Sequence, residues 1–313
     1  MLSHPVTDRR AWRRSTAPAS WRVPLPAGCL TVFDQPLGEW RRQPRQVTDL
    51  RLTGEQRGTC VPELHAVRTE LDAGSGFVVL EPPPTRYSPD EWPVLYWLLG
   101  QALGRPVEQN VQGALLYDVR DTGQDVRYGA RFSVTNAESS FHTDNSFGAE
   151  PLDYVGLPCR QTARSGGLSQ IVSAYSAHNE LLRRHPVLLE ELYRPFHVDR
   201  RGGLRVGEAP TAQFSVFAWD DGRLDCRYLR YWIEAGHEKV GEPLSAAQRS
   251  ALDALDEVLG DPELRIEFPL NPGEMFWINN RWLFHNRTAF EDHAEPKRRR
   301  HYVRLWVQAE AHP

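Results

Sequence analysis

The sequence predicts a mainly β fold with flanking helices, built around an antiparallel double-sheet jelly roll (a double-stranded β-helix). Beyond residue 112 the apolar segments are short, and turns and long insertions separate them instead of regular helices. Parallel strands would need a crossover helix between them, so this spacing favours an antiparallel arrangement. The segments expected to be strands lie at 114–119, 154–157, 170–173, 214–217, 265–268, 275–278 and 300–307.

A buried strand and a helix are expected before this region. Residues 76–80 form an apolar run that begins at a glycine, which is typical of a core strand. Ser88 then has the properties of a helix N-cap, because Pro89 suits the first helical position and Glu91 completes a capping box. Gly104 is the expected end of this helix.

A second capping box predicts another supporting helix. Ser245 and Gln248 have the required spacing, and Gly260 marks the expected end. Between them, apolar residues recur at helical spacing and form one stripe that is suited to pack against a sheet, namely Leu252, Leu255 and Leu259.

Residues 1–45 differ in composition from the rest, so we expect an N-terminal arm followed by a single domain at 46–313. The arm is rich in Arg, Trp and Pro. Such a segment can bind nucleic acid or another anionic partner. Since charge runs are commonly solvated, packing of the arm on the body through its tryptophans is the favoured interpretation. Residues 30–33 are expected to form a short strand within it.

The composition is that of an ordinary soluble protein. The 313 residues include 40% hydrophobic and 25% charged residues, with a formal net charge of -4. This balance argues against a general nucleic-acid binder, and no apolar run is long enough to cross a membrane. The four cysteines are widely spaced and no signal peptide is recognisable, so we expect a cytoplasmic protein. The oligomeric state is left open.

His142 and Asp144 are the candidate metal ligands with the clearest spacing. On an extended segment, side chains two residues apart point the same way. A further imidazole, supplied by His285 near the end of the chain, would complete a face of two histidines and one carboxylate. Such a face can hold a metal ion and leaves the opposite positions open for a co-substrate and oxygen.

The spacing of this pair is not specific by itself. It recurs at His178/Glu180, His197/Asp199 and His293/Glu295. The first pair lies in an expected helix, where residues two apart do not face each other, and the last lies in a charged loop. The pair at 197 and 199 is the serious competitor, because its segment can be extended. The surrounding sequence separates the two pairs and favours the pair at 142 and 144, so we place the ligands at His142 and Asp144.

The last predicted strand divides its side chains between two faces. By alternation, one face carries Arg300, Tyr302, Arg304 and Trp306, and the other carries His301, Val303, Leu305 and Val307. An arginine that faces inward is costly unless it meets an anion, and its planar fork suits a carboxylate. A shift of register would put Arg299 in place of Arg300, and only the alternation favours Arg300.

These segments resemble the taurine dioxygenase-like (TauD/TfdA) branch of the Fe(II)/2-oxoglutarate-dependent oxygenases. The resemblance extends from about Gly74 to Val307 and follows the order of that family's motifs. It is carried by residues 141–147, 165–169, Asn280-Arg281 with His285, and 300–304.

The resemblance implies that His142, Asp144 and His285 bind Fe(II), with 2-oxoglutarate as co-substrate and O2 as oxidant. Halogenases of the superfamily are similar but have a small residue in place of the carboxylate, which leaves a position for chloride. Because Asp144 is present, halogenation is not expected. Hydroxylation, desaturation, cyclisation and epimerisation all stay open.

The resemblance also implies which residues hold 2-oxoglutarate. Arg300 corresponds to the arginine that binds the distal carboxylate, and Ser169 stands where the family usually has a threonine that bonds the same group. Arg304 corresponds to a second arginine, which contacts the substrate in some members and the co-substrate in others.

The organic substrate is the least determined feature, and a small polar or anionic metabolite of a biosynthetic pathway is the working hypothesis. The side chains expected to surround it are those of Arg304, Trp306, Asn145, Phe147, Arg131 and Asn136. Two alternatives are kept. One is a cupin-type iron enzyme that binds no 2-oxoglutarate, and the other is a nucleic-acid-binding module that uses the N-terminal arm.

Overall fold

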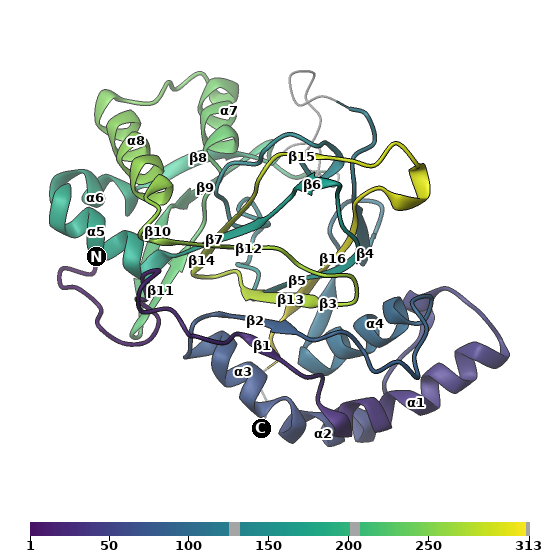
Figure 1. The fold of residues 1–313 in the computed structure, drawn as a ribbon. Coiled ribbons are helices and arrows are strands. Elements are labelled where there is room, and N and C mark those ends of the chain that lie inside the picture. Colours follow the sequence, from purple (N-terminus) through teal and green to yellow (C-terminus); the bar gives the residue numbers. More distant parts are fainter. Residues whose placement is uncertain (125–131, 201–206, 311–313) are drawn as a thin grey trace.

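The computed structural model describes residues 1–124, 132–200 and 207–310. Its centre is a sheet with the strand order β1-β2-β13-β5-β16-β3, in which β4 also pairs with β16 (Figure 1). The pairing is antiparallel apart from β1 beside β2. The strands are β1 (Arg22–Val23), β2 (Phe77–Leu80), β3 (Arg105–Val107), β4 (Leu116–Val119), β5 (Tyr154–Gln161), β13 (Met275–Asn279) and β16 (His301–Gln308).

A smaller antiparallel sheet has the order β12-β7-β14 and carries one side of the candidate site. Its strands are β7 (Ser169–Ser173), β12 (Arg265–Phe268) and β14 (Leu283–Arg287). Three two-stranded ribbons complete the described strands: β6 (Ser165–Gly166) with β15 (Phe290–Glu291), β8 (Pro195–Asp199) with β9 (Thr211–Ser215), and β10 (Phe217–Asp220) with β11 (Arg223–Cys226).

Helices occupy more of the described residues than strands do, so the chain is mixed α/β and the expectation of a mainly β fold was too narrow. The first group is α1 (Ala27–Arg42), α2 (Gly54–Glu63), α3 (His65–Asp72) and α4 (Trp92–Leu103). The second group is α5 (Ala174–Arg184), α6 (Pro186–Leu192), α7 (Arg230–Val240) and α8 (Ala246–Gly260). Short 3-10 turns lie at Val47–Asp49, Phe132–Val134 and Pro296–Arg298.

Strand β13 shows how the sheet separates two hydrophobic cores. Met275 and Trp277 pack with helices α1 to α4, which lie below the larger sheet in Figure 1. Phe276 and Ile278 point the other way, into the core shared with the smaller sheet and with α5, α6 and α8. Because side chains alternate along a strand, a single apolar strand serves both layers. This strand is buried on both faces.

Two local expectations were wrong. Residues 30–33 lie within helix α1, because buried residues recur there at helical spacing, including Cys29, Leu30, Phe33 and Leu37. The helix expected to begin at Ser88 begins at Trp92 instead, although the Ser88 backbone N–H does donate to the Glu91 carboxylate at 2.7 Å. That bond closes a turn that precedes the helix.

The helix at 245–260 is confirmed. Ser245 and Gln248 make both hydrogen bonds of a capping box, and Leu252, Leu255 and Leu259 are buried. In the described part of the chain, no helix has both the length and the apolar character that a membrane span needs.

Candidate active site

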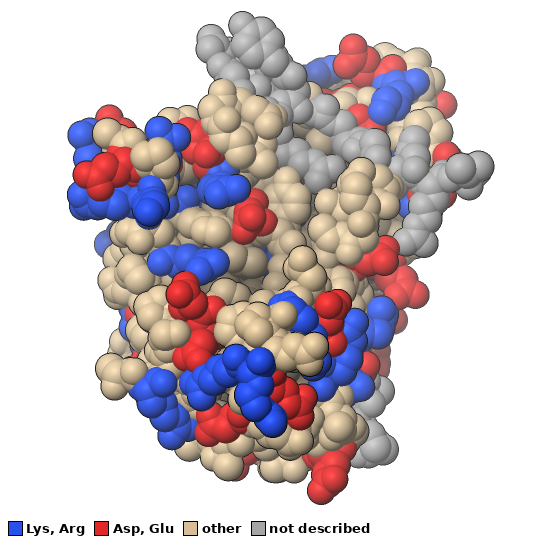
Figure 2. Space-filling model, turned by 90° about the vertical axis from the view of Figure 1, so that its right-hand side faces the viewer, with Lys and Arg blue, Asp and Glu red and all other residues tan. Residues whose placement is uncertain are grey.

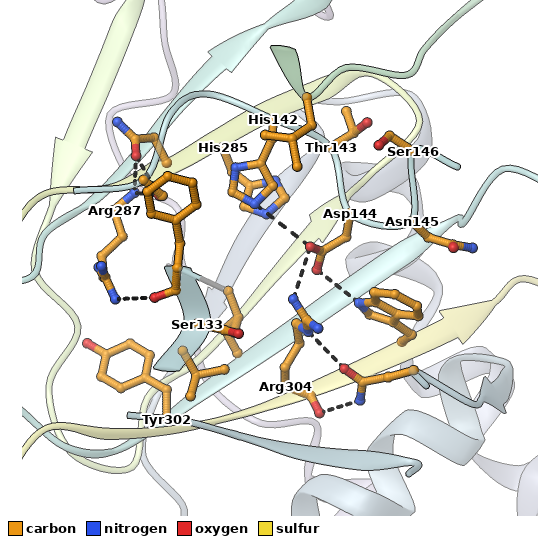
Figure 3. Close-up of a pocket in the computed structure, with 18 of the residues that line it drawn as sticks. Ser133, His142, Thr143, Asp144, Asn145, Ser146, His285, Arg287, Tyr302 and Arg304 are labelled. Carbon is orange, nitrogen blue, oxygen red and sulfur yellow. Dashed lines mark hydrogen bonds and ion pairs between the residues drawn. The ribbon is translucent and has the colours of Figure 1, made fainter. Parts of the chain in front are cut away.

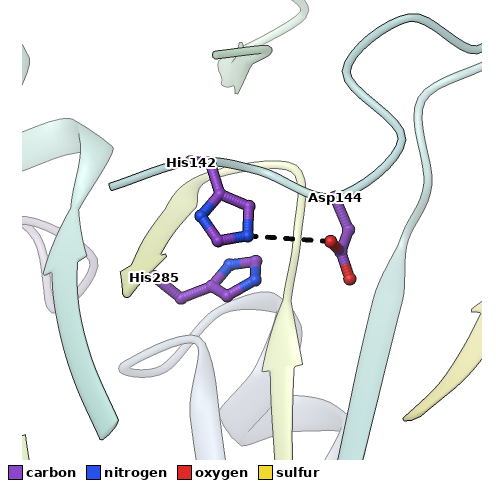
Figure 4. Close-up of side chains that lie close together, drawn as sticks. All are labelled: His142, Asp144 and His285. Atoms are coloured by element: carbon purple, nitrogen blue, oxygen red, sulfur yellow. Dashed lines mark ion pairs between the residues drawn. The ribbon is translucent and has the colours of Figure 1, made fainter. Parts of the chain in front are cut away.

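His142, Asp144 and His285 lie together at the edge of the smaller sheet (Figure 4). His285 is on β14, and His142 forms a two-way backbone bridge with it, at 3.0 and 2.9 Å between N and O. One donor atom from each of the three side chains lies within 4.8 Å of the other two. A metal ion placed among them would meet two imidazole nitrogens and one carboxylate oxygen, the donor set that suits Fe(II).

Both imidazoles are in the form that binds metals. Burial, with the neighbouring His142, lowers the pKa of His285 to about 3, and burial also lowers the pKa of His142. The Nδ1 of His142 lies 2.8 Å from the Ser140 carbonyl oxygen. Since that oxygen can only accept, Nδ1 carries the proton and Nε2 keeps its lone pair towards Asp144, 3.8 Å away.

Each carboxylate oxygen of Asp144 already has a partner. Arg304 Nη1 lies 3.1 Å from one oxygen, and the indole Nε1 of Trp306 donates to the other at 2.9 Å (Figure 3). Burial alone would raise the pKa of the Asp144 carboxyl, but these two groups help to hold the pKa below its ordinary value. The ligand is therefore ionised and oriented by residues of β16.

His142, Asp144 and His285 line a cavity of about 380 Å³, shown in part in Figure 3. The predicted alternation of the last strand is confirmed, because Arg300, Tyr302, Arg304 and Trp306 all line this cavity. On the opposite face, Val303, Leu305 and Val307 belong to the core with helices α1 to α4.

Arg300 is a buried cation in the wall of the cavity. It is 4% exposed, and its Nε and Nη1 have no hydrogen-bond partner among the described residues. Its guanidinium carbon lies 3.8 Å from the ring centre of Tyr302 and 5.1 Å from that of Phe290. Burial lowers its pKa. Arg299, the register alternative, is exposed.

Gly167, in the turn before β7, leaves room for the Arg300 side chain. Gly167 has a φ of +69°, and a Cβ added there would lie 3.1 Å from Arg300 Nε. A side chain at this position would therefore strain the backbone and press on the guanidinium. Ser169, two residues further on, is 8% exposed and lines the same cavity.

Of the other residues expected to surround the substrate, some line the cavity and some do not. Asn145, Phe147 and Trp306 line the cavity. Asn136 does not: it is exposed, and its backbone oxygen accepts from the Phe290 N–H. Arg131 lies outside the described residues.

The competing histidine pairs have other partners. His197 Nε2 is 3.2 Å from a Glu242 oxygen, and Asp199 pairs with Lys239 at 2.7 Å. His178 and Glu180 lie on α5, as the sequence indicated, and the pair at 293 and 295 is in a loop. In residues 1–124, 132–200 and 207–310, His142, Asp144 and His285 are the group whose donor atoms converge.

Several cavity residues were missed from the sequence. Arg287 follows His285 by two positions on β14, so the same alternation would have placed it on the cavity face. Its guanidinium donates to backbone oxygens of Thr135 and Ala137, and so fixes the segment that carries Ser133. No local pattern marked Gln109, which accepts from Arg304 Nε at 2.8 Å, or the α7 aromatics Tyr231 and Trp232.

Comparisons with known proteins identify the family. Residues 52–306 match the family described as taurine catabolism dioxygenase TauD, TfdA family. FR-33289 synthase of Streptomyces rubellomurinus is 28% identical over 99% of this chain and 92% of its own length. Uridine-5′-phosphate dioxygenase of Amycolatopsis sp. is 32% identical over 66% of this chain and 74% of its own length.

Solved structures share the fold. An asparagine oxygenase with Fe(II), 3-hydroxyasparagine and succinate has a TM-score of 0.64 at 19% identity, covering 92% of this chain and 93% of its own. The oxygenase OrfP with Fe and α-ketoglutaric acid has a TM-score of 0.62 at 17% identity, covering 93% and 94%. Fold and site define a non-haem Fe(II)/2-oxoglutarate-dependent dioxygenase. The chain belongs to the TauD/TfdA family.

Proposed function

We propose that His142, Asp144 and His285 bind Fe(II), and that Arg300 and Ser169 hold the distal carboxylate of 2-oxoglutarate. The observation that carries this proposal is the buried guanidinium of Arg300, which lies in the same cavity as the three convergent side chains and has two nitrogens without a hydrogen-bond partner among the described residues. Buried donors without a partner are costly, and a carboxylate that reaches them would remove that cost. This feature also favours a 2-oxoglutarate enzyme over a cupin-type iron enzyme that binds no such anion.

When bound, Fe(II) and 2-oxoglutarate supply the activation of O2, with succinate and CO2 as co-products. The residues of the chain provide orientation and exclusion of water. Trp306 and Arg304 orient the Asp144 carboxylate, and the Ser140 carbonyl fixes the His142 ring. Aromatic side chains, including Phe147 and Tyr302, cover the cavity wall.

The substrate we propose is a small polar or anionic metabolite of a biosynthetic pathway, hydroxylated at an unactivated C–H bond. Arg304 lines the cavity four strand residues, or about 13 Å, from Arg300, so it can face the organic substrate while Arg300 faces the co-substrate. Its Nη1 and Nε already bond Asp144 and Gln109, so a bond to an anionic substrate would come from its Nη2. The relatives are consistent with this class: one is named for uridine-5′-phosphate, and structures of others contain hydroxylated asparagine or arginine.

Asp144 supports oxygen insertion over halogenation, because its carboxylate fills the position that chloride would take. Desaturation, cyclisation and epimerisation use the same ligands and are rival outcomes. Product analysis by mass spectrometry separates them, since hydroxylation adds one oxygen and desaturation removes two hydrogens.

We also propose that the two antiparallel sheets form the double-stranded β-helix of this family, with residues 1–45 packed on a body at 46–313. Trp12 of the arm is 3% exposed and donates to the Ser75 carbonyl at 2.8 Å. Arg13 pairs with Glu180 at 2.8 Å. These contacts engage one tryptophan and one arginine of the arm with the body, which supports packing over nucleic-acid binding. Figure 2 shows basic and acidic side chains interspersed on one face of the molecule.

The test is an anaerobic titration of the Fe(II)-loaded protein with 2-oxoglutarate. A weak visible charge-transfer band that saturates with 2-oxoglutarate, followed by succinate release when oxygen is admitted, is the expected result. Absence of both the band and 2-oxoglutarate binding by calorimetry would exclude the proposal.

A further inference from the structure

The turn between β13 and β14 carries an asparagine that bonds the backbone of a metal-ligand residue. Asn280 is 3% exposed, and its side-chain oxygen accepts from the Asp144 N–H at 2.8 Å. Its side-chain nitrogen donates to the Asp144 carbonyl at 3.0 Å. One amide therefore satisfies both main-chain polar groups of Asp144, as a neighbouring strand would do.

Asp144 has no other strong support for its main chain. It lies in a turn, and the next residue, Asn145, has a left-handed φ of 52°. Among the described residues, neither backbone group of Asp144 has a main-chain partner. Backbone hydrogen bonds hold its neighbours instead, since His142 pairs with His285 of β14 and the Thr143 N–H donates to the Tyr228 carbonyl.

Asn280 also closes the base of the loop that follows Asp144. Its side-chain nitrogen lies 3.3 Å from the Leu152 carbonyl, and its own N–H donates to the Asp153 carbonyl at 2.7 Å. Asn280 therefore makes hydrogen bonds to the residues at both ends of the loop at 145–151. Asn145 and Phe147 of this loop line the cavity.

We infer that Asn280 is a positioning residue for the iron site, which fixes the main chain at Asp144 relative to the His285 strand. His285, five residues after Asn280, supplies another ligand. The turn that carries Asn280 therefore fixes the position of Asp144 relative to His285. Partners that lie outside the ligand shell commonly change metal affinity by about tenfold to a hundredfold when they are removed. The inference rests on the proposed function only for its metal readout.

The chain offers a matched control in the adjacent residue. Asn279 is 5% exposed, and its side chain bonds Asp72 at 3.2 Å and the Arg281 N–H at 3.0 Å. It stabilises the same end of β13 without a described bond to residues 142–147. A merely structural role for the turn would make Asn279→Ala and Asn280→Ala equivalent.

The first measurement uses Co(II) as a spectroscopic probe in place of Fe(II). We expect Asn280→Ala to weaken Co(II) binding about tenfold to a hundredfold and to alter its visible d–d bands. Asn279→Ala should stay within about threefold of the unmutated protein. Equal affinity and equal bands in Asn280→Ala and the unmutated protein would overturn the inference.

The second measurement needs no metal. Hydrogen exchange of the metal-free protein should show the Asp144 amide exchanging at least about tenfold faster in Asn280→Ala, with little change in Asn279→Ala. Unchanged exchange at Asp144 would overturn the inference even if the unmutated protein bound no metal, a result that would separately exclude the proposed function. Asn280→Ser, which is smaller and polar, replaces the alanine variant in both measurements if the latter does not fold.

Discussion

The two ends of the cavity differ in how fully their polar groups are satisfied. At the metal end, both carboxylate oxygens and both backbone groups of Asp144 have protein partners. At the other end, two guanidinium nitrogens of Arg300 have none among the described residues. Asp144, a proposed metal ligand, is thus held in place by hydrogen bonds, whereas Arg300 keeps donors that a charged ligand would satisfy.

The largest expected effect comes from removing a ligand at the metal end. His142→Ala, Asp144→Ala and His285→Ala should each abolish succinate release and iron retention while the protein stays folded, because these groups serve the site and contribute little to the core. Iron content and circular dichroism check this. His197→Ala, the matched change in the competing pair, should be mild. Loss of iron in His197→Ala but not in His142→Ala would show that the wrong pair was chosen.

The next effect tests the arginine end. Arg300→Lys keeps the charge but loses the two-pronged donor, so affinity for 2-oxoglutarate should fall about tenfold to a hundredfold, roughly 1.4 to 2.8 kcal/mol. Calorimetry of the oxygen-free, iron-loaded protein measures it. Arg299→Lys is the control, since that side chain is exposed. A large loss in the control with none in Arg300→Lys would contradict the assignment of the co-substrate arginine.

A smaller effect tests whether the hydrogen bond from Trp306 to the Asp144 carboxylate contributes to metal binding. Trp306→Phe removes the indole donor to Asp144 and keeps an aromatic ring, so metal affinity should fall about tenfold. Trp12→Phe deletes an equivalent buried indole bond far from the site and should leave metal affinity unchanged. If the two variants bind metal equally, the bond to Asp144 contributes nothing to the site.

The smallest expected effect is at Ser169. Ser169→Ala should weaken 2-oxoglutarate binding about two- to fivefold, which corresponds to one hydrogen bond of roughly 0.5 to 1 kcal/mol. Ser169→Thr supplies the hydroxyl that the family usually has and should bind like the unmutated protein. Identical affinities in the alanine and threonine variants would remove Ser169 from the co-substrate site.

What was predictable from the sequence followed from short-range geometry. Alternation along the last strand placed Arg300 and Arg304 on the cavity face, and capping rules located the helix that follows Ser245. The arginine-rich composition of residues 1–45 concealed the helical spacing of α1, so the expected strand there was wrong.

Features that depend on tertiary contacts were not accessible in this way. Asn136 is close to His142 in sequence, yet it is exposed and does not line the cavity, because a loop has no fixed alternation. Gln109 is 195 positions from Arg304, its partner, and no local pattern relates the two. The hydrogen bonds between the Asn280 side-chain amide and the Asp144 main chain join residues that are 136 positions apart.

The pairing of β16 has a consequence for the order in which the site forms during synthesis. This strand joins β3, β4 and β5, whose residues lie 140 or more positions earlier, and it follows the arginine that we assign to 2-oxoglutarate. Chains are made from the N-terminus, and distant strand pairings form slowly. All three proposed metal ligands therefore leave the ribosome before Arg300, Arg304 and Trp306. The proposed 2-oxoglutarate site can be complete only when the last strand enters the sheet.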